Sequence, residues 1–310
     1  MSKLNVAMCP SVNGFGHIRR LLSISLTMRL QGCNVVFVFP NSATQKQISL
    51  VVKHKFETIL VDIEEIEFAY QEGPFAKERN LAFDNQLSSV RELKKFNLVL
   101  ADTVSWPCHF SKHAIFIGQF SWEMYYEHQK NSESKTKTNS LLDFKQLFGM
   151  KLFSWDELID LKNFTNIELL DYWNLREKKI SKRINQIGIA SNGIIGISTE
   201  INGLEPVEIK GIPEYLMQKK ELPQYLLMRA GLGNILEGLA ARCSIFLTND
   251  SESLDVTRNR EKLIDLGLAV EINSISKMEY QIINNHRIND EINVNMISSG
   301  DLALEILRGF

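Results

Sequence analysis

Short apolar runs flank an amphipathic segment at the start of the chain. Residues 4–8 and 34–39 are almost free of polar side chains, as expected for strands that are buried on both faces of a sheet. Between them, residues 18–30 carry leucines at every fourth position of their later part, which places these leucines on one stripe of a helix. Gly32 follows as a helix stop. This order predicts a βαβ unit in a parallel sheet.

The pattern continues through the first part of the chain and then changes. Apolar runs at 97–101 and 114–118 predict further parallel strands. From about residue 127 to 185, a polar stretch and then helical patterns follow, which we interpret as an inserted helical region beside the sheet. Strand patterns at 187–190 and 194–198 are expected to close this first domain.

A second α/β pattern follows the segment VEIKGIP, which ends at Pro213. It predicts helices at 233–241 and 258–266, and strands at 244–248 and 269–272. The predicted fold class is therefore α/β, with two Rossmann-like domains of which the second is abbreviated. We place the first at residues 1–210, including the helical insertion, and the second at 211–310.

Composition narrows the function classes. The chain has 310 residues, of which 44% are hydrophobic and 23% charged, an ordinary globular balance. A formal net charge of −2 gives no reason to expect nucleic acid or an anionic membrane as the main partner. The four cysteines contain no CxxC pair, so we expect reduced thiols in a cytoplasmic protein rather than a disulfide frame or a zinc site. Neither a signal peptide nor a membrane-spanning run is apparent.

The loop between the first predicted strand and the first predicted helix carries the residues that most strongly suggest a functional site. It reads SVNGFGHIRRLL from residue 11, with Gly14 and Gly16 before a lone histidine. A glycine loop at a helix start can present backbone N–H groups to an anion. A dinucleotide fingerprint would need glycine at Arg19, so that interpretation fails. A plain tight turn is the alternative.

His17 and Asp102 are candidates for acid–base chemistry. Both follow predicted parallel strands, whose carboxyl ends form the ligand-binding edge of such sheets. A neutral imidazole there can accept a proton, and a carboxylate on its other nitrogen fixes the tautomer. The alternatives are a histidine that packs at the helix start and an acid that caps a turn.

A second glycine loop precedes the predicted helix at 233–241. Gly231 and Gly233 lie where backbone N–H groups could hold a phosphate, and Glu237 follows, where its carboxylate could bind the two hydroxyls of a ribose. A first-turn acid that favours the helix dipole is the alternative for Glu237. Asp255 and Asn259 lie four residues apart and thus on one helical face, where a solvated cap is the alternative.

Together these stretches resemble the nucleotide-sugar glycosyltransferases of the GT-B fold. The family's opening turn, helix and second strand are matched by GFGHIRRLLSISLTMRLQGCNVVFV, and its later strand, acid and aromatic segment by NLVLADTVSW and AIFIGQFSWEMYY. Its donor-binding motif is matched by RAGLGNILEGLAARCSIFLTNDSESLDVTRN. Within the family, the chain is similar to the peptidoglycan GlcNAc transferase and to the nucleotide-sugar hydrolase of the pseudaminic acid pathway.

The resemblance implies roles for particular residues. His17 matches the catalytic base and Asp102 its orienting acid. The implied acceptor-binding residues are Asn13 and Trp122, although core packing is the alternative for the aromatic run around Trp122. The residues implied to bind the donor are Gly14, Gly16, Arg229, Gly231, Gly233, Asn234, Glu237, Asp255 and Asn259.

The resemblance also implies an activity, with alternatives. We expect inverting, metal-independent transfer from a UDP-linked sugar to a sugar or lipid-linked acceptor, as in cell-envelope polysaccharide synthesis, and no D-x-D occurs in the chain. No cofactor or nucleic acid is expected, and membrane contact would be peripheral, at the inner face. Few residues separate Pro213 from Arg229, which predicts a shortened donor domain. The alternatives are a nucleotide-sugar hydrolase and an inactive nucleotide-sugar binder or partner subunit.

Overall fold

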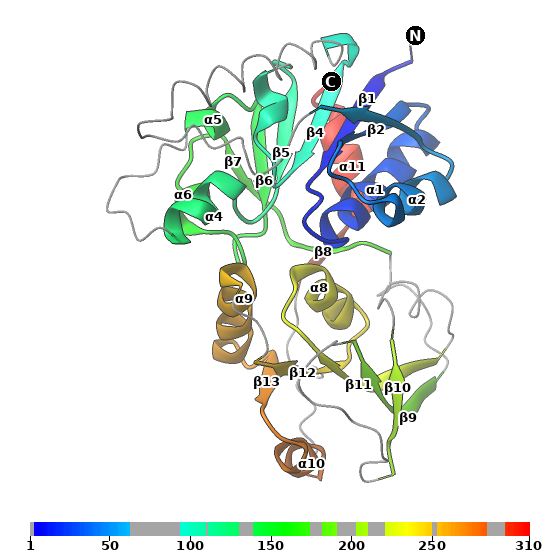
Figure 1. The fold of residues 1–310 in the computed structure, drawn as a ribbon, viewed down its shortest axis with the longest axis vertical. Helices are drawn as coiled ribbons and strands as arrows, with labels where there is room; N and C mark the ends of the chain where they lie inside the picture. The colour runs from blue at the N-terminus through cyan, green and yellow to red at the C-terminus, as the bar shows by residue number, and fades with distance from the viewer. Residues whose placement is uncertain are drawn as a thin grey trace. The chain divides into compact units, whose positions relative to one another are not determined.

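A computed structural model describes residues 3–62, 94–109, 111–129, 139–173, 182–190, 203–209, 221–249, 253–283 and 295–310. The chain divides into two compact units (Figure 1). The first comprises Met1–Ile167 and Gly300–Phe310, so the last helix returns to the unit in which the chain begins. The second comprises Glu168–Ser299.

The first unit is built on a seven-stranded sheet in which every pairing is parallel, with the order β3-β2-β1-β4-β5-β6-β7. Its first elements are β1 (Asn5–Pro10), α1 (Gly16–Leu30), β2 (Asn34–Pro40), α2 (Gln45–Lys53), β3 (Glu57–Val61), β4 (Leu98–Asp102) and β5 (Ala114–Ile117). They confirm the βαβ unit and the strands predicted near 97–101 and 114–118. Because β1 lies between β2 and β4, the order of the strands reverses there, and open α/β sheets bind ligands at such a point.

The predicted helical insertion at about 127–185 is largely wrong. Before this segment come η2 (Trp106–His109), between β4 and β5, and α4 (Trp122–Gln129), which ends within it. The segment itself contains α5 (Asn139–Leu142), β6 (Gln146–Gly149), α6 (Asp156–Ile159), β7 (Phe164–Asn166) and β8 (Leu169–Asp171). β6 and β7 extend the first sheet, and only short helices lie among the described residues of this segment. Short apolar runs fit a helix and a strand equally well, which explains the error.

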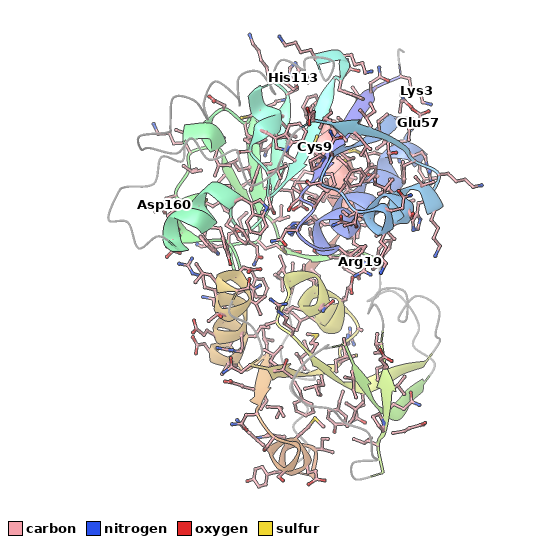
Figure 2. The ribbon with its side chains drawn as sticks, viewed as in Figure 1. Lys3, Cys9, Arg19, Glu57, His113 and Asp160 are labelled. Carbon is pink, nitrogen blue, oxygen red and sulfur yellow. The ribbon has the colours of Figure 1, made fainter. Side chains whose placement is uncertain are left out.

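The core of the first unit sits around its central strands. Residues 6–10 of β1 are all buried, as are the aromatic side chains of Phe37 and Phe39 in β2. Cys9 of β1 is fully buried in the first unit (Figure 2), and burial raises the pKa of its thiol far above the usual range. The helix α11 (Ser299–Arg308) completes the unit, and Lys145 donates a hydrogen bond to the carbonyl of Gly309 at 3.0 Å.

The second unit has its own, smaller parallel sheet, with the order β10-β9-β11-β12-β13. Its further elements are β9 (Lys182–Ile189), β10 (Glu205–Glu208), β11 (Glu221–Met228), α8 (Leu232–Ala240), β12 (Ser244–Thr248), α9 (Leu254–Asp265), β13 (Ala269–Ile272), α10 (Ile275–Ile283) and β14 (Met296–Ser298), which pairs with β8. Tyr225 and Phe246 stack in its core with ring centroids 5.5 Å apart. The helices and strands predicted after residue 230 are confirmed.

The second unit begins at Glu168, whereas the boundary predicted from the sequence lies near residue 210. The strand predicted at 187–190 was expected to close the first domain, but it belongs to β9, which pairs within the second sheet. An apolar strand pattern does not reveal which sheet the strand joins, so the boundary was misplaced. The strand predicted at 194–198 and the crossing at Pro213 lie outside the described residues. In the part of the chain that the structure describes, no helix combines the length and apolar content needed to cross a bilayer.

Candidate active site

The loop after β1 lies against the end of β4. Parallel register aligns Pro10 with Asp102, and the Ser11 N–H donates to the Asp102 carbonyl at 3.1 Å. The loop then turns at Gly14, whose φ of +92° is a left-handed conformation that glycine adopts without a steric penalty. α1 begins at Gly16, and Phe15 before it offers no side-chain cap. The loop therefore brings the start of α1 to the carboxyl ends of β1 and β4.

Gln47 fixes this loop from α2. Its side-chain amide donates to the Val12 carbonyl at 2.6 Å and to the Gly14 carbonyl at 3.2 Å. The side chain of Gln47 also accepts a hydrogen bond from the N–H of Thr44, the N-cap of α2, and completes a capping box with it. Gln47 therefore ties the start of α2 to the loop. Gln47 is buried, which makes these bonds part of the packed structure rather than a surface contact.

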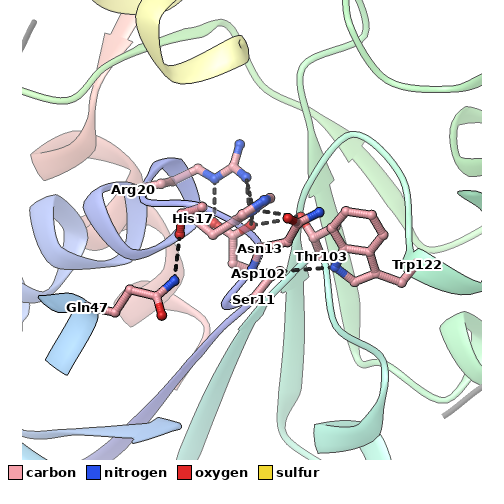
Figure 3. Close-up of polar contacts among 9 residues, drawn as sticks. Ser11, Asn13, His17, Arg20, Gln47, Asp102, Thr103 and Trp122 are labelled. Atoms are coloured by element: carbon pink, nitrogen blue, oxygen red, sulfur yellow. Dashed lines mark hydrogen bonds and ion pairs between the residues drawn. The ribbon is translucent and has the colours of Figure 1, made fainter. Parts of the chain in front are cut away.

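His17 and Asp102 lie side by side (Figure 3), as the sequence predicted. His17 is in the first turn of α1, Asp102 is the last residue of β4, and the imidazole Nδ1 lies 2.8 Å from Oδ1 of the carboxylate. A carboxylate only accepts, so Nδ1 carries a hydrogen, and in the neutral imidazole Nε2 is then the nitrogen without one. No described residue forms a hydrogen bond with Nε2. The His17 side chain is 18% exposed, whereas Asp102 is fully buried.

Arg20 is a site residue that the sequence reasoning missed. It lies one turn after His17 on α1, and its guanidinium donates twice to Asp102 (Figure 3). Nε donates to Oδ2 at 2.5 Å and Nη2 to Oδ1 at 2.6 Å, and the arginine is only 3% exposed. The spacing of three residues from His17, which places both side chains on one helical face, was the signal available in the sequence.

Thr103 adds a further hydrogen bond in an unusual backbone conformation. Its φ is +66°, which is rare for a β-branched residue and costs about 1–3 kcal/mol. Its hydroxyl donates to Asp102 Oδ1 at 2.9 Å and lies 3.2 Å from His17 Nδ1. The surrounding structure holds this conformation, because the Thr103 N–H donates to the Ile117 carbonyl at 3.1 Å.

The charge of Asp102 is set by opposing effects. Burial alone would raise the pKa of the carboxyl group, but the Arg20 guanidinium and His17 lower it through their charges and hydrogen bonds. The net effect holds the pKa of Asp102 below its usual range, so the carboxyl is ionised at neutral pH.

The predicted acceptor residues lie beside His17. The Trp122 ring is 6.5 Å from the His17 ring, centroid to centroid, and the indole N–H donates to the Ser11 hydroxyl at 3.0 Å. Asn13 is exposed, and its backbone N–H also donates to the Ser11 hydroxyl, at 3.1 Å. Phe120 near Trp122 is buried, as the core-packing alternative expected. An acceptor-binding role for Asn13 and Trp122 stays a prediction.

In the second unit, the predicted donor residues gather around the start of α8. Arg229 directly follows β11 and is exposed. Gly231 is the N-cap of α8 and supplies no side-chain bond to the first N–H groups, and Gly233 and Asn234 lie in the half-buried first turn. The positive end of the helix dipole is therefore open to an anion here.

The remaining donor residues differ in their surroundings. Asn259 on α9 is buried and donates to the Ala230 carbonyl at 3.2 Å, which ties α9 to the loop before α8. Glu237 is also buried, at 2% exposure. Asp255 lies in the first turn of α9 and accepts a hydrogen bond from the hydroxyl of Ser253, the N-cap residue, whose side chain makes no cap bond to the helix backbone. Roles in donor binding stay predictions for all of them.

Two further observations bear on ligands. Among the described residues, no group of three or more His, Cys, Asp and Glu side chains is arranged to hold a metal ion. The four cysteines are all buried, and none of them forms a disulfide with another.

Comparison with known proteins identifies the fold. MurG of Acinetobacter baumannii superposes with a TM-score of 0.64 at 11% identity, with 99% of both chains covered. The glycosyltransferase SnogD of Streptomyces nogalater superposes with a TM-score of 0.55 at 12% identity, again with 99% of both chains covered. Arabidopsis thaliana UGT89C1, complexed with UDP-L-rhamnose, gives 0.52 at 12%, over 99% of this chain and 95% of its own. The chain has a GT-B fold.

The resemblance inferred from the sequence is thus confirmed at the level of the fold, over the full length of the chain. The GT-B fold consists of two Rossmann-like domains, in agreement with the two parallel sheets. No protein-family model and no curated protein matches the chain by sequence.

Proposed function

We propose that this protein is an inverting glycosyltransferase that uses a nucleotide-sugar donor and His17 as its general base. The observation that carries the proposal is the 2.8 Å pair between His17 Nδ1 and Asp102, at the strand ends of a GT-B fold. General bases of this kind contribute about 10²- to 10⁴-fold to the rate of a reaction.

The proposed step is a single displacement. His17 Nε2 accepts the proton of an acceptor hydroxyl while that oxygen attacks the anomeric carbon of the donor. The bond between the anomeric carbon and the diphosphate oxygen breaks, and a nucleoside diphosphate leaves with the electron pair. Asp102 holds the imidazole in the required tautomer and stabilises the imidazolium that forms.

The donor is proposed to bind through the second unit. The start of α8 offers backbone N–H groups and Arg229 a positive charge, which would neutralise the leaving diphosphate without a metal ion. Glu237 would bind the ribose hydroxyls. Two similar structures are described in complex with UDP and with UDP-L-rhamnose, which supports a UDP-linked donor. Asn13 and Trp122, next to His17, would contact a sugar or lipid-linked acceptor.

Hydrolysis of the nucleotide-sugar is the second candidate. The His17–Asp102 pair can remove a proton from water as well as from a sugar hydroxyl, and the exposed loop at Asn13 leaves the base accessible to water. An inactive binder or partner subunit would keep the donor residues without turnover.

Product analysis separates these functions. The purified protein is incubated with a panel of nucleotide-sugars, with and without candidate acceptors, and nucleoside diphosphate and sugar products are measured. Transfer predicts a glycosylated product that depends on the acceptor, whereas hydrolysis predicts free sugar without one. Nucleotide binding by calorimetry without either product would show a binder, and the absence of both binding and turnover across the panel would contradict the proposal.

A further inference from the structure

We infer that Arg20 is a positioning residue of the base: it fixes the Asp102 carboxylate and keeps His17 in the neutral, Nδ1-protonated form. The meaning of this arrangement for catalysis rests on the proposed function. The arrangement itself can be tested without a substrate, because it concerns the protonation of one histidine.

The geometry of the three side chains supports the inference that Arg20 fixes the Asp102 carboxylate. Arg20 donates from Nε and Nη2 to the two different oxygens of Asp102, a forked contact that sets the plane of the carboxylate. With its plane set, Oδ1 faces His17 Nδ1 at 2.8 Å. A lysine would supply a point charge at this place but no fork.

The charges around His17 support the inference that Arg20 keeps the imidazole neutral. Arg20 and Asp102 together are neutral, so a protonated His17 would add an uncompensated positive charge beside a buried guanidinium. Arg20 Nη2 lies only 3.3 Å from His17 Nδ1, so the positive charge of the guanidinium is close to the ring and disfavours a second positive charge on it. Without Arg20, His17 would be the only positive partner of a buried carboxylate and would take up a proton more readily.

Among the described residues, the other groups that contact the imidazole are uncharged. Of the described residues, Asp102 on β4 and Arg20 on α1 are the charged groups that contact the His17 ring. Thr103, which follows β4, and Trp122 on α4 contribute a hydroxyl and an aromatic ring. The protonation of His17 is therefore governed by the balance between one negative and one positive side chain.

The test is a pH titration of His17 by ¹⁵N NMR of histidine-labelled full-length protein. Loss of one signal in His17→Ala assigns the resonance among the six histidines. In the wild type we expect the neutral ring with its hydrogen on Nδ1. In Arg20→Met the midpoint of protonation is expected to rise by about one pH unit or more.

The matched control is Arg29→Met, which removes an exposed arginine further along the same helix. Its His17 midpoint should equal that of the wild type. An unchanged midpoint in folded Arg20→Met, or an equal rise in Arg29→Met, would overturn the inference.

A second pair of variants covers the case in which Arg20→Met does not fold. Asp102→Asn and the double variant Arg20→Met/Asp102→Asn lack the buried carboxylate and differ only in Arg20. The inference predicts that His17 protonates at lower pH in the variant that keeps Arg20, and equal midpoints contradict it.

Activity distinguishes failure of this inference from failure of the proposed function. Shifted midpoints in a protein that turns over no nucleotide-sugar would contradict the proposed function alone. If the enzyme is active, the acid limb of its pH–rate profile should move to higher pH in Arg20→Met and stay near that of the wild type in Arg20→Lys, with a lower kcat. Activity with an unmoved acid limb in Arg20→Met would contradict the inference alone.

Discussion

At the scale of the residue, Asp102 organises the site. It is fully buried and accepts hydrogen bonds from three side chains, those of His17, Arg20 and Thr103. A buried charge is tolerated only when it is paired and hydrogen-bonded, so the three partners and the carboxylate depend on one another.

Loss of the charge on Asp102 should therefore affect both stability and activity. In Asp102→Asn, Arg20 becomes a buried cation without its anion, which typically costs about 3–5 kcal/mol. We expect urea unfolding to show a loss of this order and turnover, once a substrate is known, to fall by about 10²-fold or more. A variant as stable as the wild type would contradict the buried ion pair.

The stability contributed by Asp102 should also depend on pH. The folded-state pKa lies below the ordinary aspartate value of about 3.9, so the contribution is fully present above that value and disappears as the pH falls through the folded-state pKa. The difference in unfolding free energy between the wild type and Asp102→Asn should be constant from pH 7 to about 5 and shrink below about 4. A difference that grows on acidification would contradict this sign.

The sequence revealed part of this constellation. His17 and Asp102 could be predicted because each follows an apolar strand, and parallel strands place such residues at one edge of the sheet. Arg20 could have been found from its spacing to His17. The contribution of Thr103 could not, because it depends on a left-handed backbone conformation that nothing in its residue type suggests.

At the scale of the element, the loop between β1 and α1 determines where His17 lies. The two glycines of this loop, Gly14 and Gly16, differ in backbone conformation. Gly14 adopts a positive φ, whereas Gly16 starts the helix with an ordinary φ, and a Cβ atom would meet no other atom within 4 Å at either position.

Alanine at these two positions should thus have opposite effects. Gly14→Ala is expected to destabilise the protein by about 1–2 kcal/mol through backbone strain. Gly16→Ala should be neutral or stabilising by up to about 1 kcal/mol, because it restricts the unfolded chain. Urea unfolding of both variants measures this, and equal effects would show that the loop conformation is not as described.

Elements with a helical stripe or an unbroken apolar run were predicted well, whereas the strands after residue 127 were not. α1 and β12 agree closely with their predicted ranges. β6 and β7 were assigned to a helical insertion because these short strands, QLFG and FTN, lack an unbroken apolar run. The sheet to which β9 belongs is decided by long-range pairing, which local pattern does not contain.

At the scale of the whole molecule, the chain has the two parallel-sheet units of a GT-B fold. The proposed base, His17, lies in the first unit and the predicted donor residues lie in the second. The predicted abbreviation of the donor half is explained in part by the misplaced boundary, since β9 and β10 add two strands before β11.

Nucleotide binding should therefore stabilise the protein. A ligand that binds only the folded state at 100 times its Kd adds about 2.7 kcal/mol to the unfolding free energy. We expect UDP to raise the Tm of the wild type and to do so less in Glu237→Gln, because the ribose would lose its carboxylate partner. An identical shift in both proteins would contradict the role of Glu237.

The most direct test of the central claim compares His17→Ala with the wild type on an accepted nucleotide-sugar. The account predicts a fall in nucleoside diphosphate release of about 10²- to 10⁴-fold, with UDP affinity by calorimetry unchanged. His113→Ala, a change of the same kind near the C-terminal Phe310, serves as the control and should keep its rate. Release at the wild-type rate by His17→Ala would contradict the assignment of His17 as the base.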